Sequence, residues 1–349
     1  MILENVYEKY WNIMPPLARA SYIKGDIVYI LDETQLPYKM VYLESRNYID
    51  SYNAIKEMRT RAGGQTLTIV NTMVLELRKT KEKEPKEILS HLRMVAEKLG
   101  SARPTAPLMK IALKIYGLME KPIEKRDFEE AEHRVALFVK EYFDRKIGFA
   151  NHAAEVLEDG YTVLTHCNIS GGMVLVGREC RKQGKNISFI ATETRPYLQG
   201  ARLTVWELME DGFEVKLIPD NMAATVISEG LVDAVIVGSD RCARNGDIAN
   251  KIGTYQIALA AFEYNIPFYV WVTSVDFETC CGEKIPIEYR REEEVYMLHG
   301  KRLYPENIET VYPAFDVTPA KYITAFITSY GIVTPQLAMK HRGLWKIDF

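Results

Sequence analysis

The sequence predicts an α/β protein: a smaller, mainly helical N-terminal domain with a short β-rich start, followed by a Rossmann-like, doubly wound parallel sheet. Helical periodicity dominates the first part of the chain, whereas from Gly160 onward short β-rich runs alternate with amphipathic segments, the order that builds βαβ units. At 349 residues the chain is also longer than one average domain. We therefore expect an N-terminal domain over residues 1–135, with a β-hairpin and helices, and a Rossmann-like domain over residues 136–349.

The first elements are a hairpin and a series of helices. The β-rich runs Asp26–Asp32 and Lys39–Glu44 flank a turn at Leu36-Pro37 and predict the hairpin. Proline is tolerated in the first turn of a helix and glycine often ends one, so a helix is expected from Pro85 to Gly100. A second helix should follow Arg103-Pro104, and a long charged amphipathic stretch over residues 126–159 predicts a connecting helix.

Six β-rich runs predict the strands of the sheet: Thr162–Thr165, Ile187–Ala191, Glu214–Ile218, Asp233–Val237, Phe268–Val272 and Ile332–Val333. The first five lead into polar clusters: Thr165–Asn168, Thr192–Arg195, Pro219–Asn221, Gly238–Arg241 and Thr273-Ser274. Ligands of open α/β sheets bind at the carboxyl ends of the strands. Turn formation and helix capping explain most polar strand ends, but cysteine and arginine are not turn formers, which favours a site here.

Composition limits the classes of function. With 47% hydrophobic and 26% charged residues the chain is typical of a soluble globular protein, and a net charge of −3 gives no basic surface for nucleic acid. No apolar run approaches the roughly 18 residues of a membrane span, and the N-terminus lacks the layout of a secretory signal. Five cysteines without CxxC spacing favour the reducing cytoplasm.

The sequence contains no motif for a bound cofactor. The segment Asn168–Gly172 opens a helix whose N–H groups are suited to a phosphate, but it is neither a GxGxxG fingerprint nor a P-loop. The six histidines also lack metal-ligand spacing. We expect no cofactor and no metal.

Longer strings resemble the methylthioribose-1-phosphate isomerases: Thr165–Asn168, Glu193–Leu208, Asp220–Ala224, Gly238–Arg241, Asn245–Tyr255 and Pro313–Pro319. The N-terminal part is similar more loosely, through Leu31-Asp32, Val41–Glu44 and Ala54–Arg59. The wider superfamily also holds ribose-1,5-bisphosphate isomerases, 5-deoxyribose-1-phosphate isomerases and the alpha, beta and delta subunits of a translation-initiation exchange factor. The resemblance implies a small N-terminal domain, a Rossmann-like domain and a homodimer.

The implied activity is that of an aldose–ketose isomerase acting on a 1-phosphorylated pentose. The first candidate is conversion of 5-methylthioribose 1-phosphate to 5-methylthioribulose 1-phosphate, a cytoplasmic step of methionine salvage. The alternatives are isomerisation of 5-deoxyribose 1-phosphate or ribose 1,5-bisphosphate, and a non-catalytic regulatory subunit. The presence of Cys167 and Asp240 together with Asn250-Lys251 favours an enzyme, because a scaffold does not need that set.

The resemblance also implies roles for particular residues. Cys167 matches the catalytic cysteine and Asp240 the catalytic acid. The alternatives without a catalytic role are a buried, inert thiol for Cys167, and a helix cap or an ion pair with Arg241 for Asp240. The implied substrate-binding residues are Arg61, Ala62, Gly63, Arg103, Gln199, Asn250 and Lys251. The alternatives without a binding role are surface charges for the arginines and a solvated residue at a helix start for Lys251.

Two loops depart from the family pattern. Residues 61–66 read Arg-Ala-Gly-Gly-Gln-Thr where the family usually has Arg-Gly-Ala-Pro-Ala-Ile-Gly, and Ile169–Met173 replaces a stretch of smaller residues. The change is neutral if glycine and alanine still allow the backbone to approach phosphate closely. Alternatively it marks a paralogue with a different group at C5 or with a second phosphate.

Overall fold

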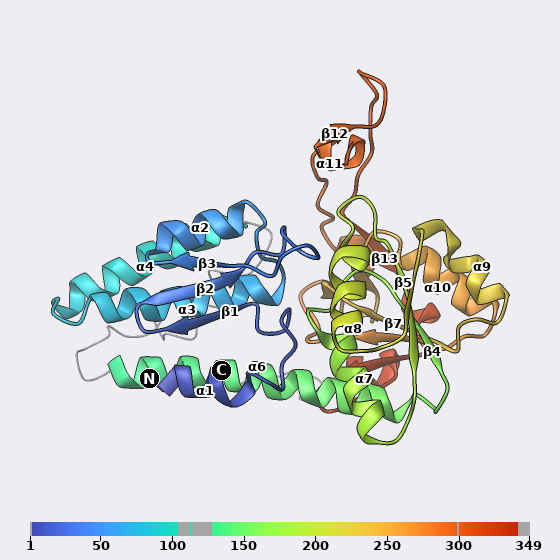
Figure 1. Ribbon diagram of the computed structural model, residues 1–349, viewed down its shortest axis with the longest axis horizontal. Helices are drawn as coiled ribbons and strands as arrows, with labels where there is room; N and C mark the ends of the chain where they lie inside the picture. The colour runs from blue at the N-terminus through green and yellow to red at the C-terminus, as the bar shows by residue number, and fades with distance from the viewer. Residues whose placement is uncertain (1, 104–111, 114–127, 299, 341–349) are drawn as a thin grey trace. The chain divides into compact units, whose positions relative to one another are not determined.

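The computed structural model describes residues 2–103, 112–113, 128–298 and 300–340 (Figure 1). Contacts between Cα atoms divide the chain into two compact units, one reaching Arg145 and the other beginning at Lys146. This division and the boundary expected at residue 135 both fall within one helix, α6 (Phe128–Glu155). α6 corresponds to the predicted connecting helix, whereas the helix expected after Arg103-Pro104 lies outside the described residues.

A three-stranded antiparallel sheet forms the β-rich start of the first unit. Its strands are β1 (Ser21–Lys24), β2 (Ile27–Leu31) and β3 (Tyr42–Ser45), in the order β1-β2-β3. The pairing of β2 with β3 confirms the predicted hairpin. β1 was not predicted; it reaches β2 through a tight turn in which Gly25 has a φ of 58°, a value that glycine adopts without strain.

The helices beside this sheet include α1 (Ile2–Tyr10), α2 (Tyr48–Lys56), α3 (Gly63–Lys79) and α4 (Pro85–Ser101). α4 confirms the predicted helix and its apolar face is buried, but the helix continues through Gly100, so the expected end is wrong by one residue. α3 is buried along almost its whole length and packs against β1, β2 and the helices α2 and α4.

The second unit is built on a seven-stranded sheet in the order β15-β14-β10-β7-β4-β5-β6. Six neighbouring strands are parallel: β4 (Thr162–Thr165), β5 (Ser188–Thr192), β6 (Val215–Ile218), β7 (Ala234–Gly238), β10 (Phe268–Trp271) and β14 (Ala325–Thr328). The edge strand β15 (Gly331–Val333) runs antiparallel to β14. All six predicted strands are present, and β14 was missed.

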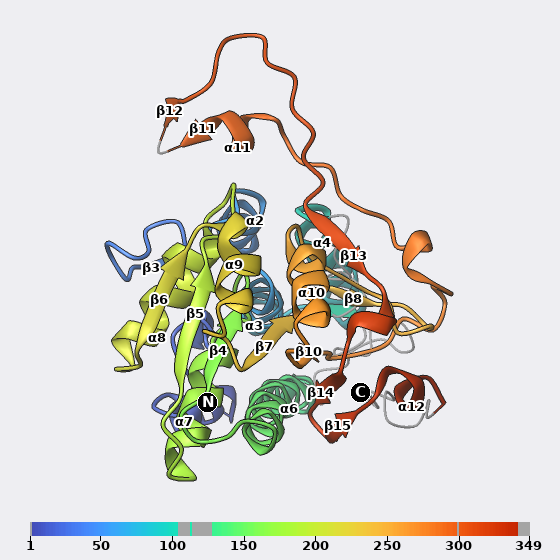
Figure 2. The ribbon, with the colours of Figure 1, turned by 90° about the vertical axis from the view of Figure 1, so that its right-hand side faces the viewer.

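Helices lie on both faces of this sheet, as the doubly wound prediction requires (Figures 1 and 2). α7 (Gly172–Lys182) and α8 (Trp206–Glu210) lie on one face; α9 (Ala223–Ser228) and α10 (Thr254–Glu263) lie on the other. Side chains of α9 and α10 form one apolar cluster with those of the central strands, including Ile227, Ile257 and Val235. A short helix, α12 (Pro335–Lys340), follows β15 and contacts β14.

The order of the central strands places a topological switch point between β4 and β7. From β4 the chain moves outward through β5 to β6, then crosses back to β7 on the other side of β4 and continues to β10. The loops that leave β4 and β7 therefore diverge to opposite faces of the sheet. In open α/β sheets, the crevice at such a point is where ligands bind.

A smaller antiparallel sheet, in the order β13-β9-β8, stands beside the main one. It contains β8 (Arg241–Cys242), β9 (Ile248–Lys251) and β13 (Phe315–Thr318), none of which was predicted. Between β9 and β13 an arm extends from the second unit, carrying α11 (Glu293–Tyr296), β11 (Met297–Leu298) and β12 (Lys301–Arg302) (Figures 1 and 2). Among the described residues, no helix is both long enough and apolar enough to cross a membrane.

Candidate active site at the carboxyl edge of the sheet

Cys167 lies in the turn that leaves β4, on one side of the switch point. Its side chain is partly exposed and its φ of 65° is left-handed, a conformation that is costly for a residue with a Cβ atom. The backbone N–H of Cys167 donates to Thr194 Oγ1 at 2.9 Å, and its carbonyl accepts from the Thr204 hydroxyl. The strain is therefore held by side chains of the next loop, a pattern that clusters at functional sites.

The turn continues into the N-terminus of α7. Asn168 Oδ1 accepts the N–H of Ser170 at 2.9 Å, and Asn168 Nδ2 donates to Thr204 Oγ1 at 3.0 Å. Ser170 and Gly171 are both left-handed, and α7 begins at Gly172, the last residue of the segment that was predicted to open a helix. The first N–H groups of a helix carry a partial positive charge, which suits a phosphate.

The loop after β5 contains Gln199, a predicted substrate-binding residue. Only 4% of Gln199 is exposed, and its Oε1 accepts no hydrogen bond within the described part of the chain. The next residue must be glycine, because a Cβ atom at Gly200 would lie 1.8 Å from the Thr192 carbonyl oxygen. The close approach brings the π-helical turn Gly200–Val205 directly against the end of β5.

Asp240 follows β7, on the other side of the switch point. The residue is exposed, and its backbone N–H donates to the carbonyl of Ala249 at 2.9 Å, which fixes it to β9. The guanidinium of Arg241 lies 4.0 Å from the carboxylate of Asp276. β4 and β7 are hydrogen-bonded neighbours, so Cys167 and Asp240 follow adjacent strand ends.

Asn250 and Lys251 end β9 and are both buried, with 5% and 8% exposed. Asn250 Nδ2 donates to Thr254 Oγ1 at 2.9 Å. The Lys251 ammonium donates to the Ala314 carbonyl at 3.0 Å and lies 4.5 Å from the centre of the Phe315 ring. The alternative of a solvated residue at a helix start is therefore wrong for Lys251, because its ammonium is buried and donates to a backbone carbonyl.

His166 is buried and neutral, although it precedes Cys167. Its Nε2 lies 2.9 Å from the carbonyl oxygen of Ile252, which can only accept, so Nε2 carries the proton and Nδ1 accepts from the Thr192 hydroxyl. Burial lowers the pKa of His166, which excludes a permanent imidazolium beside the thiol. His166 therefore links the end of β4 to the segment before α10 by a hydrogen bond to the Ile252 carbonyl.

Asp316 lies within one of the family-like strings but was not predicted as a site residue. Its carboxylate accepts the N–H groups of Gly253 at 2.7 Å and Tyr255 at 3.2 Å, at the N-terminus of α10. Burial raises the pKa of Asp316 to about 6, against the lowering effect of these N–H donors. Its negative charge supports the positive end of the α10 dipole.

Lys146 was missed by the sequence analysis because it is one of many charged residues in a long helix. Only 8% of it is exposed, and its ammonium donates to the Ser170 carbonyl at 2.9 Å. Burial lowers the pKa of Lys146 to about 8, against the opposing field of Glu207. The amine thus fixes the strained turn between Cys167 and α7 through a hydrogen bond.

We expect Lys146→Met to lower kcat roughly ten- to a hundredfold, because loosening this turn misplaces the Cys167 thiol. KM should change less, and Lys146→Arg should retain much of the rate because it can still donate to the Ser170 carbonyl. The matched control is Lys185→Met: Lys185 donates to the Ala154 carbonyl at 2.7 Å near the opposite edge of the sheet. Equal losses of kcat in both methionine variants would contradict the role of Lys146.

The remaining predicted residues belong to the first unit. Arg61, Ala62 and Gly63 stand together at the N-terminus of α3, where Glu33 accepts from the backbone N–H of Arg61 at 2.9 Å and from its Nε at 3.2 Å. Arg61 is therefore paired with a buried carboxylate and is not a solvated surface charge.

A Cβ atom at Gly63 would lie 2.0 Å from the Tyr142 hydroxyl, so the start of α3 leaves no room for a side chain there. The guanidinium of Arg103 contacts the sulfur of Met58. The structure thus brings the Arg61–Gly63 segment together on one helix end, while Gln199, Asn250 and Lys251 lie in the other unit with Cys167 and Asp240.

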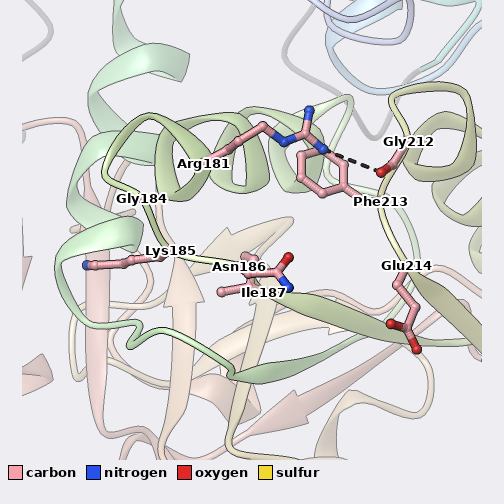
Figure 3. Close-up of a pocket in the computed structure, with 8 residues that line it drawn as sticks. All are labelled: Arg181, Gly184, Lys185, Asn186, Ile187, Gly212, Phe213 and Glu214. Atoms are coloured by element: carbon pink, nitrogen blue, oxygen red, sulfur yellow. Dashed lines mark hydrogen bonds between the residues drawn. The ribbon is translucent and has the colours of Figure 1, made fainter.

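A pocket of about 240 Å³ opens at the opposite edge of the main sheet, near the amino ends of β5 and β6 (Figure 3). Lys185, Asn186 and Ile187 line it, and the Arg181 guanidinium lies 4.2 Å from the centre of the Phe213 ring. None of the predicted site residues lines this pocket. Its place, at the wrong end of the strands for a switch-point ligand, separates it from the chemistry at Cys167.

A family profile and full-length relatives of known name both match this chain. The profile of the Initiation factor 2 subunit family matches residues 62–335. The methylthioribose-1-phosphate isomerase of Fervidobacterium nodosum is 40% identical over 328 residues, which cover 89% of this chain and 93% of the relative. That of Acetivibrio thermocellus is 41% identical over 340 residues, covering 92% of this chain and 97% of the relative.

Two solved structures share the fold along nearly the whole chain. The crystal structure of 5-methylthioribose 1-phosphate isomerase from Pyrococcus horikoshii has a TM-score of 0.84 at 34% identity, covering 96% of this chain and 98% of that chain. The crystal structure of translation initiation factor eIF-2B subunit delta from A. fulgidus has a TM-score of 0.82 at 35% identity, covering 93% and 99%.

Proposed function

The chain belongs to the Initiation factor 2 subunit family, with the methylthioribose-1-phosphate isomerases as its relatives, and we propose that it converts 5-methylthioribose 1-phosphate to 5-methylthioribulose 1-phosphate. One structural observation carries the proposal: Cys167 and Asp240 follow β4 and β7, the two strands that flank the topological switch point. A thiol and a carboxylate at that place suit a reaction that moves hydrogen between neighbouring carbons and between their oxygens.

The net reaction is an isomerisation in which every atom is retained. The bond between C1 and the ring oxygen breaks, and the ring oxygen becomes the C4 hydroxyl. The hydrogen on C2 moves to C1, and the C2 hydroxyl loses its proton to become the ketone. We assign the hydrogen transfer between carbons to the neighbourhood of Cys167 and the proton transfer between oxygens to Asp240, which is exposed and can exchange protons with solvent.

The same edge of the sheet offers donors for the phosphate. A phosphate dianion removed from water needs several charge-assisted donors. We assign this role to the N–H groups at the start of α7, to the Lys251 ammonium and to the amide groups of Asn250 and Gln199. The buried Oε1 of Gln199, which accepts no hydrogen bond from the described residues, is suited to a sugar hydroxyl.

The first unit supplies a second set of candidate binding groups. The left-handed start of α3 at Ala62, the adjacent Gly63 and the paired Arg61 are assigned to the substrate, together with Arg103. We further propose that the protein acts as a cytoplasmic homodimer in methionine salvage, with residues 1–135 and 136–349 as its two domains. Light scattering of the purified protein measures the mass and tests the dimer.

An activity panel tests the substrate assignment. Purified protein is offered 5-methylthioribose 1-phosphate, 5-deoxyribose 1-phosphate and ribose 1,5-bisphosphate, and formation of each ketose is measured. We expect the highest kcat/KM for the methylthio substrate. A preference for the bisphosphate or the deoxy sugar would move the protein to another isomerase of the superfamily, in keeping with its altered sequence at residues 61–66.

A second candidate function rests on one comparison. Similarity at 35% identity to the A. fulgidus protein described as an eIF-2B delta subunit favours a non-catalytic role in binding a protein partner or a sugar phosphate. The panel separates the two functions, because a regulatory subunit turns over none of the three sugars.

A further inference from the structure

Cys280 and Cys281 are adjacent in the loop that follows β10, and the reaction described above uses neither. Their sulfur atoms lie 3.5 Å apart. Cys280 is exposed and Cys281 is partly exposed, whereas Cys180 and Cys242 are buried. The loop thus presents two neighbouring thiols at the surface.

The residue before the pair is held in place. The Thr279 hydroxyl donates to Asp276 Oδ2 at 2.7 Å, and the Thr279 carbonyl accepts the N–H of Arg244 at 2.8 Å. Asp276 is itself fixed, because its backbone N–H donates to the carbonyl of Cys242 in β8 at 2.8 Å. The first flank of the pair is therefore hydrogen-bonded to β8 and the turn that follows it.

The residue after the pair is also held in place. The N–H of Gly282 donates to Asp247 Oδ2 at 3.0 Å. A Cβ atom on Gly282 would lie 2.4 Å from Val317 Cγ1 and 2.9 Å from Asp247 Cβ, so the backbone has no free space on that side. Asp247 also accepts the N–H of Ala320 at 2.9 Å, which joins this flank to the segment after β13.

Both flanks therefore meet the hairpin formed by β8 and β9. Asp240 immediately precedes β8, and Asn250 and Lys251 end β9. Asp247 lies in the turn between the two strands. A change of shape at Cys280-Cys281 has a short route through Asp247 to the residues assigned to the substrate.

We propose that Cys280 and Cys281 form a dithiol modification site that reacts with small disulfides of the glutathione type and closes a disulfide between the two adjacent residues. In the first step a thiolate attacks the small disulfide, forming a mixed disulfide and releasing one thiolate. In the second step the neighbouring thiolate attacks the mixed disulfide and releases the second. The protein loses two electrons and two protons, and the small disulfide is reduced to two thiols.

Electrostatics assigns the order of attack. The hydrogen bond with Cys280 raises the pKa of Cys281, so Cys281 retains its proton to higher pH. The more exposed Cys280 therefore makes the first attack, and Cys281 closes the ring. The thiolate is the reactive form, and an exposed thiolate reacts faster than a buried one.

Ring closure must move the backbone. A disulfide bond is about 2.05 Å long, so the two sulfur atoms must approach each other by about 1.5 Å. Side-chain rotation alone does not give ordinary disulfide geometry, because neighbouring Cα atoms are about 3.8 Å apart across a trans peptide, whereas disulfide-linked Cα atoms are usually about 4.4–6.8 Å apart, so the peptide between the two residues must distort. Gly282 packs directly against Val317 and Asp247, so a shift of its backbone displaces Asp247 in the β8–β9 turn. We expect this displacement to lower isomerase activity. This last expectation rests on the proposed function; the disulfide itself does not.

The test is incubation of the whole protein with oxidised glutathione, followed by peptide mass analysis and assay. We expect the peptide carrying residues 280 and 281 to lose two hydrogen atoms, kcat/KM to fall several-fold, and dithiothreitol to restore both. Hydrogen exchange of the 241–251 hairpin should increase on oxidation. A stable glutathione adduct without ring closure, or no reaction at either residue, would overturn the proposal.

The variants separate this site from Cys167. Cys280→Ser and Cys281→Ser should each leave the basal activity unchanged and prevent ring closure. The double variant, Cys280→Ser with Cys281→Ser, detects oxidation elsewhere in the protein. If oxidised glutathione lowers its activity as far as that of the unsubstituted protein, the loss arises at Cys167, and the proposed link between the Cys280–Cys281 disulfide and activity is wrong. If no sugar is turned over, the mass and hydrogen-exchange results still decide whether the disulfide forms.

Discussion

Replacing Cys167 by alanine should lower kcat by about a thousandfold, within the range that a positioned proton-transfer group contributes. The loss should be specific to chemistry, because the hydrogen bonds that hold this turn use the Cys167 backbone and not its thiol. Alanine at a φ of 65° carries a strain similar to that of cysteine, so the fold should persist. The measurement is kcat by product formation, with circular dichroism and thermal melting as checks on folding.

The matched control is Cys180→Ala. Cys180 is fully buried in α7, and burial raises the pKa of its thiol to about 11, so it is inert at neutral pH. We expect this variant to melt at a lower temperature, because it leaves a small cavity, while its kcat stays the same. If Cys167→Ala retained full turnover with an intact fold, the thiol would have no part in the reaction.

The second large effect is expected from Asp240→Asn, which should lower kcat by roughly a hundred- to a thousandfold. Asparagine has the same shape but can neither accept nor deliver a proton at neutral pH. Because Asp240 is exposed and its backbone N–H pairs with Ala249 whichever side chain is present, the stability of the fold should change little. The measurement is the dependence of kcat on pH in both proteins.

Asp233→Asn is the control for this substitution. Asp233 immediately precedes β7, where its carboxylate accepts the N–H of Thr162 at 2.7 Å. It therefore lies at the opposite end of the same strand from Asp240, away from the switch point. Its kcat should be unchanged. An Asp240→Asn variant with full activity and an unaltered pH profile would exclude a proton-transfer role for Asp240.

The main sheet was predictable because its strands are short, strongly apolar and separated by helices. β14 was missed although its four residues are all buried, because it follows the turn Ala320–Tyr322 and leads directly into β15, without the flanking helices that mark the central strands. β9 was missed because it contains Asn250 and Lys251, which are polar in sequence. Their burial depends on Phe315 and Ala314, distant in the chain, and local patterns do not report such partners.

The candidate site also contains residues that the sequence predicted and residues that only the structure reveals. Cys167 and Asp240 were found because each follows a recognisable strand and lies in a family-like string. Lys146 and Glu33 act through other residues: one holds the Ser170 carbonyl, the other Arg61. Neither has a distinctive neighbour in sequence, so only the folded chain reveals it. The burial of His166, which makes it neutral, is likewise a tertiary effect.

The strand order also sets when the site can assemble during synthesis. Val163 in β4 pairs with Phe189 in β5, but on its other side it pairs with Ala234 in β7, much later in the chain. A chain emerging from the ribosome therefore completes β4, β5 and β6 before the strand that precedes Asp240 exists. Until then one edge of β4 has no partner, and the Cys167 turn stands beside an open strand edge. The nascent chain thus passes through a stage at which the thiol is made but the crevice is not.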